Sequence, residues 1–298
     1  MGSSVEMLSE FKEKMLRTFE MTDLGCLRYF LGLEVVQSNE GLFVSQQKYA
    51  EDLLKKTGML NCRKFSTPMN ANDKLSLEDS SGKTDPVRYR KVVGSLLYRT
   101  HTRPDLVFAV GIVSRFMQSP SLHHFGTVKR ILHYVAGTIG HGLMYTNSEE
   151  LKLCVFTDSD WGGATDDRRS TSGWCFSLGS AAVAWSSKKQ LITALSSTEA
   201  EYIAATSAAC EAVWLRRLLS DFGMKFTEPT VIQCDNKSAI LITQNPTMHG
   251  RTKHIDTRFH FIRDLVCNGE ISVVYCSTNE QVADIFTKAL PSCKFEYF

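Results

Sequence analysis

A chain of 298 residues that is 43% hydrophobic and 22% charged has the composition of a globular protein, with length for one large domain or two ordinary ones. Its longest apolar runs, such as Ala181–Trp185, are far too short to span a bilayer, and the N-terminus shows no secretory signal. The net charge of +2 divides into +3 for residues 1–150 (19 basic, 16 acidic) and −1 for residues 151–298 (15 basic, 16 acidic). Any basic surface for a nucleic acid must therefore be local.

The nine cysteines are scattered singly from Cys26 to Cys293, without a Cys-x-x-Cys pair. This pattern argues against zinc and disulfide frameworks and favours a reducing compartment. Several cysteines lie inside apolar runs, where a free cysteine behaves as a small hydrophobe: Cys154, Cys175, Cys234 and Cys276.

The first sixty residues have the pattern of a helix, a hairpin and a second helix. The expected elements are a helix at Glu10–Phe19, strands at Tyr29–Val36 and Leu42–Val44 around the turn Asn39-Glu40-Gly41, and a helix at Gln46–Thr57 that stops at Gly58. Residues 64–86 are polar, which predicts a linker or long loop. From Val87 to Gly137 we expect two or three helices, broken by Pro104 and Pro120.

After about residue 148 strands and helices alternate. The strands expected are Leu151–Thr157, Ser172–Leu178, Ala182–Ser186, Val231–Cys234 and Ile271–Cys276, and the helices are Thr198–Leu219, one from about Ser238, His254–Cys267 and a last one from Glu280. The long helix is packed with alanines, which allow it to lie close on a sheet. This order predicts an α/β fold, a mixed sheet with helices on both faces.

Four acidic residues lie at ends of these elements: Asp158, Glu201, Asp235 and Asp284. Because ligands bind outside the carboxyl ends of strands in open α/β sheets, Asp158 and Asp235 can share one edge. Clustered carboxylates repel one another unless a metal neutralises them. Capping explains the same residues separately, since Ser196-x-x-Glu199 and Thr198-x-x-Glu201 both fit the capping box, and Asp235 and Asp284 suit helix N-termini. Spacing alone leaves both interpretations open.

Several motifs follow one another in the second half over about 140 residues: Val155–Gly163, Arg169–Gly173, Ser186–Gln190, Ser196–Tyr202, Cys234–Asn236, Arg251–Asp256 and Ala283–Lys288. In this order they resemble the ribonuclease H domain of the Pol polyprotein of copia-type (Ty1/copia) LTR retrotransposons. Upstream, Leu24–Gly32 resembles the primer-grip hairpin of reverse transcriptase, and Val93–Tyr98 with Thr102–Asp105 resembles the connection region. The resemblance covers almost the whole chain.

The resemblance implies a ribonuclease H-like mixed five-stranded sheet behind a mainly helical thumb and connection region. The domains expected are a reverse transcriptase palm and thumb remnant at 1–65, the connection at 66–148, ribonuclease H at 149–290 and a truncated tail at 291–298. The polymerase signature Tyr-x-Asp-Asp is absent from this sequence. We therefore expect a fragment that begins after the polymerase chemistry and does not synthesise DNA by itself.

The activity implied is Mg²⁺-dependent cleavage of the RNA strand of RNA–DNA hybrids during reverse transcription. The metal-binding acids of the family fall on Asp158, Glu201, Asp235 and Asp284; its Glu-x-x-Ala pattern fits Glu201 better than Glu199. Two Mg²⁺ ions are expected, with Mn²⁺ as a substitute. Asp158 would bridge both, Glu201 and Asp235 would flank one and Asp284 would hold the other. The implied partners are the hybrid and the rest of the Pol polyprotein, with no membrane, in a cytoplasmic virus-like particle or the nucleus.

One departure concerns the loop before the last aspartate. Many cellular ribonucleases H carry a histidine there, whereas this chain has Ser277-Thr278-Asn279-Glu280. The role of that histidine in proton transfer or product release is therefore unfilled or taken over elsewhere.

Phosphate contacts are expected from basic residues in two stretches: Lys188, Lys189, Arg251, Lys253, His254 and Arg258. A solvated basic face explains them equally well. The four tryptophans, Trp161, Trp174, Trp185 and Trp214, are expected in the core. Two other functions remain open: a catalytically silent remnant that only binds nucleic acid or protein, and an integrase-like nuclease, against which the order of the acids argues.

Overall fold

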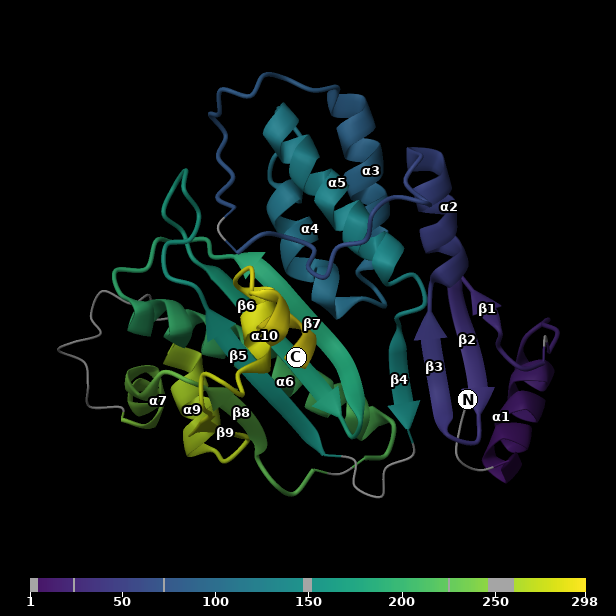
Figure 1. Cartoon of the computed structure of the whole chain (residues 1–298). Coiled ribbons are helices and arrows are strands. Elements are labelled where there is room, and N and C mark those ends of the chain that lie inside the picture. Colours follow the sequence, from purple (N-terminus) through teal and green to yellow (C-terminus); the bar gives the residue numbers. More distant parts are fainter. Residues whose placement is uncertain (1–4, 24, 72, 147–151, 225, 246–259) are drawn as a thin grey trace.

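The computed structural model describes residues 5–23, 25–71, 73–146, 152–224, 226–245 and 260–298. Two β-sheets and a group of helices build the molecule (Figure 1). The first sheet lies near the N-terminus, and the helices α3, α4 and α5 stand above both sheets in this view. The second sheet is built from the strands predicted for residues after 148. No helix in the described ranges is long and apolar enough to cross a membrane.

The N-terminal sheet has four antiparallel strands in the order β1 (Tyr29–Phe30), β2 (Leu33–Ser38), β3 (Gly41–Ser45) and β4 (Leu143–Thr146). The predicted hairpin is confirmed, but its first strand is interrupted where Leu31 and Gly32 adopt positive φ angles of 47° and 78°. Strand β4 was not predicted, because its partner β3 is about a hundred residues away in the sequence. Helix α1 (Val5–Thr18) precedes this sheet and buries none of its residues.

Helix α2 (Gln47–Thr57) ends at Gly58, whose left-handed conformation lets its N–H reach the carbonyls of the last turn. Residues 64–71 and 73–85 form an irregular stretch, as predicted, apart from short turns. Three α-helices then follow as expected: α3 (Pro86–Arg99), α4 (Val107–Ser114) and α5 (Leu122–Gly137), with the 3₁₀-helix η1 (Pro104–Leu106) before α4. Prolines and N-caps set these boundaries, since Asp85 caps α3 in front of Pro86 and Ser121 caps α5.

The second sheet has five strands in the order β7-β6-β5-β8-β9. These strands are β5 (Leu153–Ser159), β6 (Thr171–Leu178), β7 (Ala181–Lys189), β8 (Thr230–Cys234) and β9 (Ile271–Tyr275). Strand β5 pairs antiparallel with β6 and parallel with β8. The predicted mixed five-stranded sheet is therefore confirmed, with β5 at its centre.

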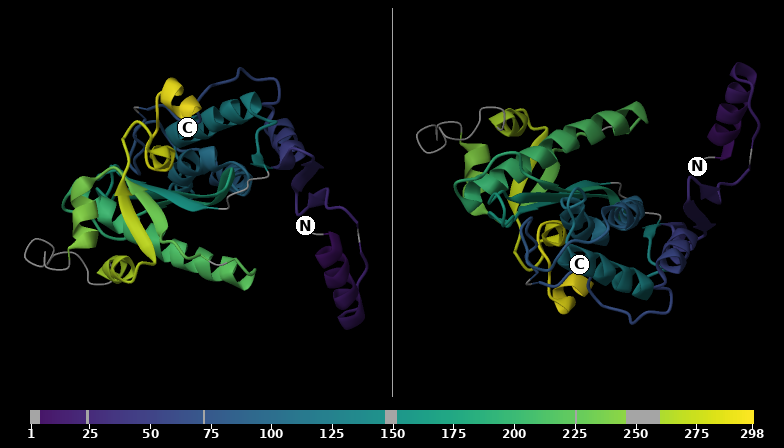
Figure 2. Two further views of the ribbon diagram at one scale, coloured as in Figure 1. Left: turned by 90° about the horizontal axis from the view of Figure 1, so that it is seen from below. Right: turned by 90° about the horizontal axis from the view of Figure 1, so that it is seen from above.

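Helices cover both faces of this sheet (Figure 2). On one face lies the long helix α6 (Ser197–Asp221), with α7 (Lys237–Gln244) and α9 (Phe261–Cys267) beside it. The alanines of α6 at positions 200, 204, 205, 208, 209 and 212 are fully buried, as close packing on a sheet requires. On the other face lie α4, the 3₁₀-helix η3 (Val282–Phe286) and the short helix α10 (Ser292–Tyr297).

Gly173 allows η3 to lie close to β6. A Cβ atom at this position would stand 2.6 Å from the Phe286 Cβ and 2.8 Å from the Thr287 Cγ2. These distances are far below an ordinary contact. The glycine therefore sets how near the segment with Asp284 can approach the central strands.

Three expectations need correction. The last helix is not continuous from Glu280, because η3 ends at Phe286 and α10 begins only after Pro291. Trp161 and Trp214 are 59% and 55% exposed, because they sit on a loop and on the outer side of α6, whereas Trp174 is buried as expected. Of the helix predicted at His254–Cys267, the part before residue 260 lies outside the described residues.

Candidate active site

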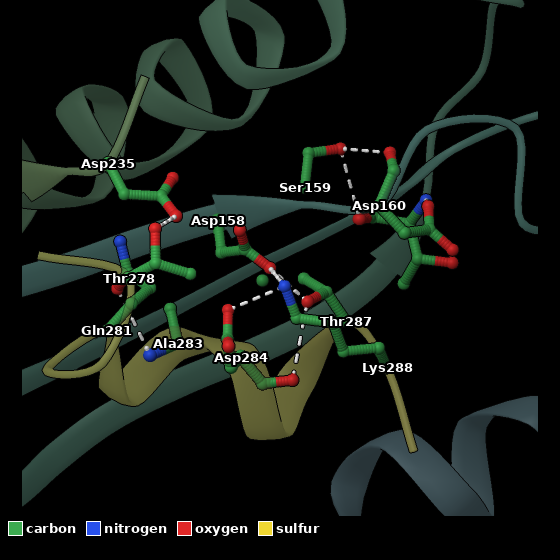
Figure 3. Close-up of polar contacts among 12 residues, drawn as sticks. Asp158, Ser159, Asp160, Asp235, Thr278, Gln281, Ala283, Asp284, Thr287 and Lys288 are labelled. Carbon is green, nitrogen blue, oxygen red and sulfur yellow. Dashed lines mark hydrogen bonds and ion pairs between the residues drawn. The ribbon is translucent and has the colours of Figure 1, made fainter. Parts of the chain in front are cut away.

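Asp158 lies on the central strand, one residue before its end. It stands opposite Gly173 of β6 and is 2% exposed. The strand continues to Ser159, two residues further than predicted. Asp235 directly follows β8, the parallel neighbour of β5. The carboxyl ends of parallel strands meet at one edge, and Figure 3 shows both carboxylates there.

Glu201 joins them from the second turn of α6. Its Oε1 accepts a hydrogen bond of 3.2 Å from the N–H of Ser159, the residue that follows Asp158. Its carboxylate also lies in one cluster with Cys234 and Asp235, in which the polar atoms are within 4.8 Å of one another. Glu201 is 5% exposed.

Ser196 caps α6, and Glu199, not Glu201, bonds the backbone at the start of this helix. Ser196 is the N-cap of α6 and accepts from the Glu199 N–H at 3.1 Å. The Glu199 Oε2 accepts from the Leu195 N–H at 2.8 Å. Spacing left open whether these glutamates stabilise the helix start or join the acidic cluster. In the structure Glu199 does the first and Glu201 the second.

Asp284 approaches from the opposite face of the sheet, on η3, and is fully buried. Two lysines form ion pairs with it: Lys288 Nζ lies 2.7 Å from Oδ1 and Lys294 Nζ lies 2.6 Å from Oδ2. Lys288 also stands 3.5 Å from the Asp158 Oδ2, so its ammonium lies between the two aspartates (Figure 3). The Thr287 hydroxyl donates to the same Asp158 oxygen.

Burial disfavours the charged forms of these acids. Burial raises the pKa of Asp158 above its ordinary 3.8, the Lys288 ammonium lowers it and Asp284 raises it again, with a net increase. Burial, and then the charges of Asp158 and Asp235, raise the pKa of Glu201 well above 4.5. Nearby, burial raises the pKa of Asp160 to about 6. Without a cation, the fold therefore favours the protonated forms of these acids.

The donor set fits a magnesium ion. Carboxylate oxygens are hard ligands of the kind that Mg²⁺ prefers, and ammonium groups already compensate the charge beside Asp284. No described lysine or arginine forms an ion pair with Glu201 or Asp235. Burial and the neighbouring Glu201 raise the pKa of the Cys234 thiol. Without a metal ion the thiol form of Cys234 is therefore favoured, and the other two donors of this cluster are the carboxylates that magnesium prefers.

Sequence reasoning missed four side chains around the acids. Thr287, Lys288 and Lys294 are described above. Thr278 donates to the Asp235 Oδ2 at 3.0 Å. It lies in the loop where this chain has no histidine and many cellular ribonucleases H have one. The sequence did contain a hint for Thr287 and Lys288, since both belong to the motif Ala283–Lys288. No sequence motif pointed to Thr278 or Lys294.

The expected basic contacts are only partly described. Lys188 is exposed on the edge strand β7, whereas Lys189 forms an ion pair with Asp167 at 2.7 Å. Arg251, Lys253, His254 and Arg258 lie outside the described residues. Lys188 thus remains the best described candidate for a phosphate contact.

Known proteins are similar to this chain over its whole length. The family described as reverse transcriptase (RNA-dependent DNA polymerase) matches residues 1–71. The retrovirus-related Pol polyprotein from transposon RE1 of Arabidopsis thaliana is 41% identical over 297 residues, which make up 100% of this chain and 20% of that protein. A putative transposon Ty5-1 protein of Saccharomyces cerevisiae is 32% identical over 211 residues, 70% of this chain and 68% of that protein.

Among solved structures, the N-terminal RNase H domain of a Mycobacterium tuberculosis protein is 13% identical, with a TM-score of 0.35, and covers 46% of this chain and 91% of that chain. A likeness of this size carries no argument about function, and the assignment rests on the sequence relatives. The chain spans about a fifth of the RE1 polyprotein. It belongs to the copia-type retrotransposon Pol family and includes the end of the reverse transcriptase region.

Proposed function

We propose that this site hydrolyses the RNA strand of RNA–DNA hybrids with Mg²⁺ as cofactor. The observation that carries the proposal is the convergence of four acids from four separate elements. Asp158, Glu201 and Asp284 are almost completely buried, and Asp235 lies within 4.8 Å of Glu201. A fold gains no stability from gathering buried like charges. A bound cation would compensate the charge that such a cluster gathers.

Asp158 holds the central position, since the residue after it, Ser159, donates to Glu201 and the Lys288 ammonium beside Asp284 lies 3.5 Å from its Oδ2. Glu201 and Asp235 would hold one Mg²⁺ with it, and Asp284 the other. Bound Mg²⁺ would neutralise the scissile phosphate, lower the pKa of the attacking water and stabilise the leaving oxygen. Mn²⁺ should substitute. The products would carry a 3′-hydroxyl and a 5′-phosphate.

The protein side chains around the acids orient them. The Thr287 hydroxyl directs one oxygen of Asp158 toward η3, and Thr278 directs one oxygen of Asp235 toward the loop after β9. Lys288 and Lys294 hold the Asp284 carboxylate in place through one ion pair at each of its oxygens. Selectivity for the hybrid requires contacts with RNA 2′-hydroxyls on the cut strand.

Several finer assignments belong to the same proposal. The nuclease would occupy residues 149–290, behind a palm and thumb remnant at 1–65 and a connection at 66–148, with 291–298 as a tail. Lys188 and Lys189, together with Arg251, Lys253, His254 and Arg258, would contact phosphates of the hybrid. The other partner would be the remainder of the Pol polyprotein, in whose company the domain would act during reverse transcription.

The test uses the purified chain with labelled RNA–DNA hybrid, duplex DNA and single-stranded RNA, each with Mg²⁺ or with EDTA. We expect cleavage of the RNA strand of the hybrid only, and only with Mg²⁺. Asp158→Asn should abolish it while the fold stays intact. Asp221→Asn, at the exposed end of α6, is the matched control and should retain full activity.

Other outcomes point elsewhere. Cleavage of duplex DNA would support an integrase-like nuclease. Binding of the hybrid without cleavage would support a catalytically silent remnant. Full activity in Asp158→Asn would refute the assignment of the acids.

A further inference from the structure

Gln190 connects three elements next to the acidic cluster without touching a carboxylate. It directly follows β7 and is 6% exposed. Its Nε2 lies 2.9 Å from the Ser172 Oγ on β6, 3.2 Å from the Ser159 Oγ on β5 and 2.9 Å from the Ala200 carbonyl oxygen on α6. Its backbone N–H donates to the Ser170 carbonyl at 2.7 Å. One buried amide therefore ties the edge strand to the central strand and to the start of α6.

The Ala200 carbonyl determines the orientation of this amide. A carbonyl oxygen can only accept a hydrogen bond, so the amide nitrogen must face it and not the amide oxygen. The two serines can then accept from the remaining N–H. The Gln190 Oε1 is buried and accepts no hydrogen bond within the described part of the chain. The hydrogen bonds of the Gln190 Nε2 therefore fix the side chain in an orientation that leaves its Oε1 without a hydrogen bond.

Two of the three partners of Gln190 lie beside the acids in the sequence. Ser159 follows Asp158, and Ala200 precedes Glu201. The Ser159 N–H in turn donates to the Glu201 Oε1. A closed path therefore runs from Gln190 through Ser159 to Glu201 and back through Ala200. Along this path the distance between β5 and the first turns of α6 is fixed, and with it the separation of the Asp158 and Glu201 carboxylates.

We propose that Gln190 is a positioning residue for the pair Asp158 and Glu201, and that it sets the affinity of the site for divalent cations. The inference rests on the proposed function, because it assumes that these two acids bind the metal. Groups that orient metal ligands from behind commonly change metal affinity by about 10- to 100-fold when they are removed. Ser196 also stabilises the start of α6, because its hydroxyl accepts a hydrogen bond from the Glu199 N–H. Unlike Gln190, its side chain makes no described hydrogen bond to β5 or β6.

The test compares Gln190→Met, which keeps the length of the side chain and removes its donors, with Ser196→Ala. Binding of Mg²⁺ and Mn²⁺ to the full chain is measured by isothermal titration calorimetry, and the midpoint of urea unfolding is measured in EDTA. Both variants should unfold at lower urea. Only Gln190→Met should bind the cations about tenfold or more weakly, and saturating Mg²⁺ should restore most of its hybrid cleavage.

Wild-type affinity in folded Gln190→Met, or an equal loss of affinity in Ser196→Ala, would overturn the inference. If Gln190→Met does not fold, Ser172→Ala replaces it, since it removes one acceptor and leaves the bond to Ala200. One hydrogen bond of ordinary strength corresponds to a loss of about threefold in affinity, and an unchanged affinity there also counts against the inference. If the wild-type chain binds neither cation, the proposed function itself fails, which is a different result.

Discussion

The close approach of η3 to β6 at Gly173 leads to a sharp prediction for Gly173→Ala. The added methyl group would lie 2.6 Å from the Phe286 Cβ and 3.2 Å from the Phe286 carbonyl carbon. An ordinary carbon contact is about 3.5 Å, so the shortfall is about 0.9 Å. The first atom is a Cβ and the second belongs to the backbone, so no rotation of a side chain can relieve the contact. The segment η3 must move away from the sheet.

This movement has two expected consequences. Overpacking of this kind costs about 1–3 kcal/mol of stability, here by loosening the small cluster of Ile285, Phe286 and Leu290. Asp284 lies two residues before Phe286, so its carboxylate should retreat from Asp158 by a similar distance. A misplacement of about 1 Å in a catalytic constellation can reduce the rate about 100-fold.

Urea unfolding and hybrid cleavage measure the two effects. Gly94→Ala is the matched control, because a Cβ at this exposed position of α3 meets nothing within 4 Å. In the interior of a helix it should stabilise the chain by up to about 1 kcal/mol and leave cleavage unchanged. If Gly173→Ala is as stable as the wild type and cleaves within about twofold of it, the close approach does not position Asp284, and the reasoning from steric contact is wrong.

Two further predictions concern buried charge. Arg103 is almost fully buried and forms two bonds with Asp105, Nε to Oδ1 at 2.9 Å and Nη2 to Oδ2 at 2.6 Å. Asp105→Asn leaves this guanidinium without its counter-charge and should lower the free energy of unfolding in urea by about 3 kcal/mol. The control Asp52→Asn, in an exposed pair 3.9 Å from Lys55, should lower it by less than about 0.5 kcal/mol. Equal losses of stability in the two variants would contradict this prediction. Folding raises the pKa of Glu201 above 4.5, so its contribution to stability is complete below about pH 4.5 and is lost as the pH rises through the raised value. In EDTA, the unfolding temperature of Glu201→Gln should therefore fall less with rising pH than that of the wild type, and identical slopes would show that the pKa of Glu201 does not change on folding.

Much of the second half of the fold could be predicted from local patterns. Alternating strand and helix signals predicted five strands and the alanine-rich helix, and their type and order are confirmed. Strand ends shifted by one to three residues, as at Ser159 and Lys189, because pairing with a neighbouring strand extends a strand beyond its apolar run. Strand β4 and the break of the last helix were missed, since both depend on partners far away in the sequence.

The acids of the candidate site were proposed from the sequence, and the arrangement around them was not. Sequence motifs named Asp158, Glu201, Asp235 and Asp284, because a residue type at the end of an element is a local property. The division of roles between Glu199 and Glu201 and the lysines beside Asp284 came only from the tertiary structure.

The reason is physical. Composition, periodicity and turn residues act over a few neighbours along the chain, and so the sequence determined which elements form and which acids stand at their ends. Burial, pKa and ion pairing depend on distances between groups that only packing brings together, as with Lys294 from α10 and Asp284 from η3. The tertiary structure alone decided that these acids share one edge of the sheet, and which amides and ammonium groups hold them there.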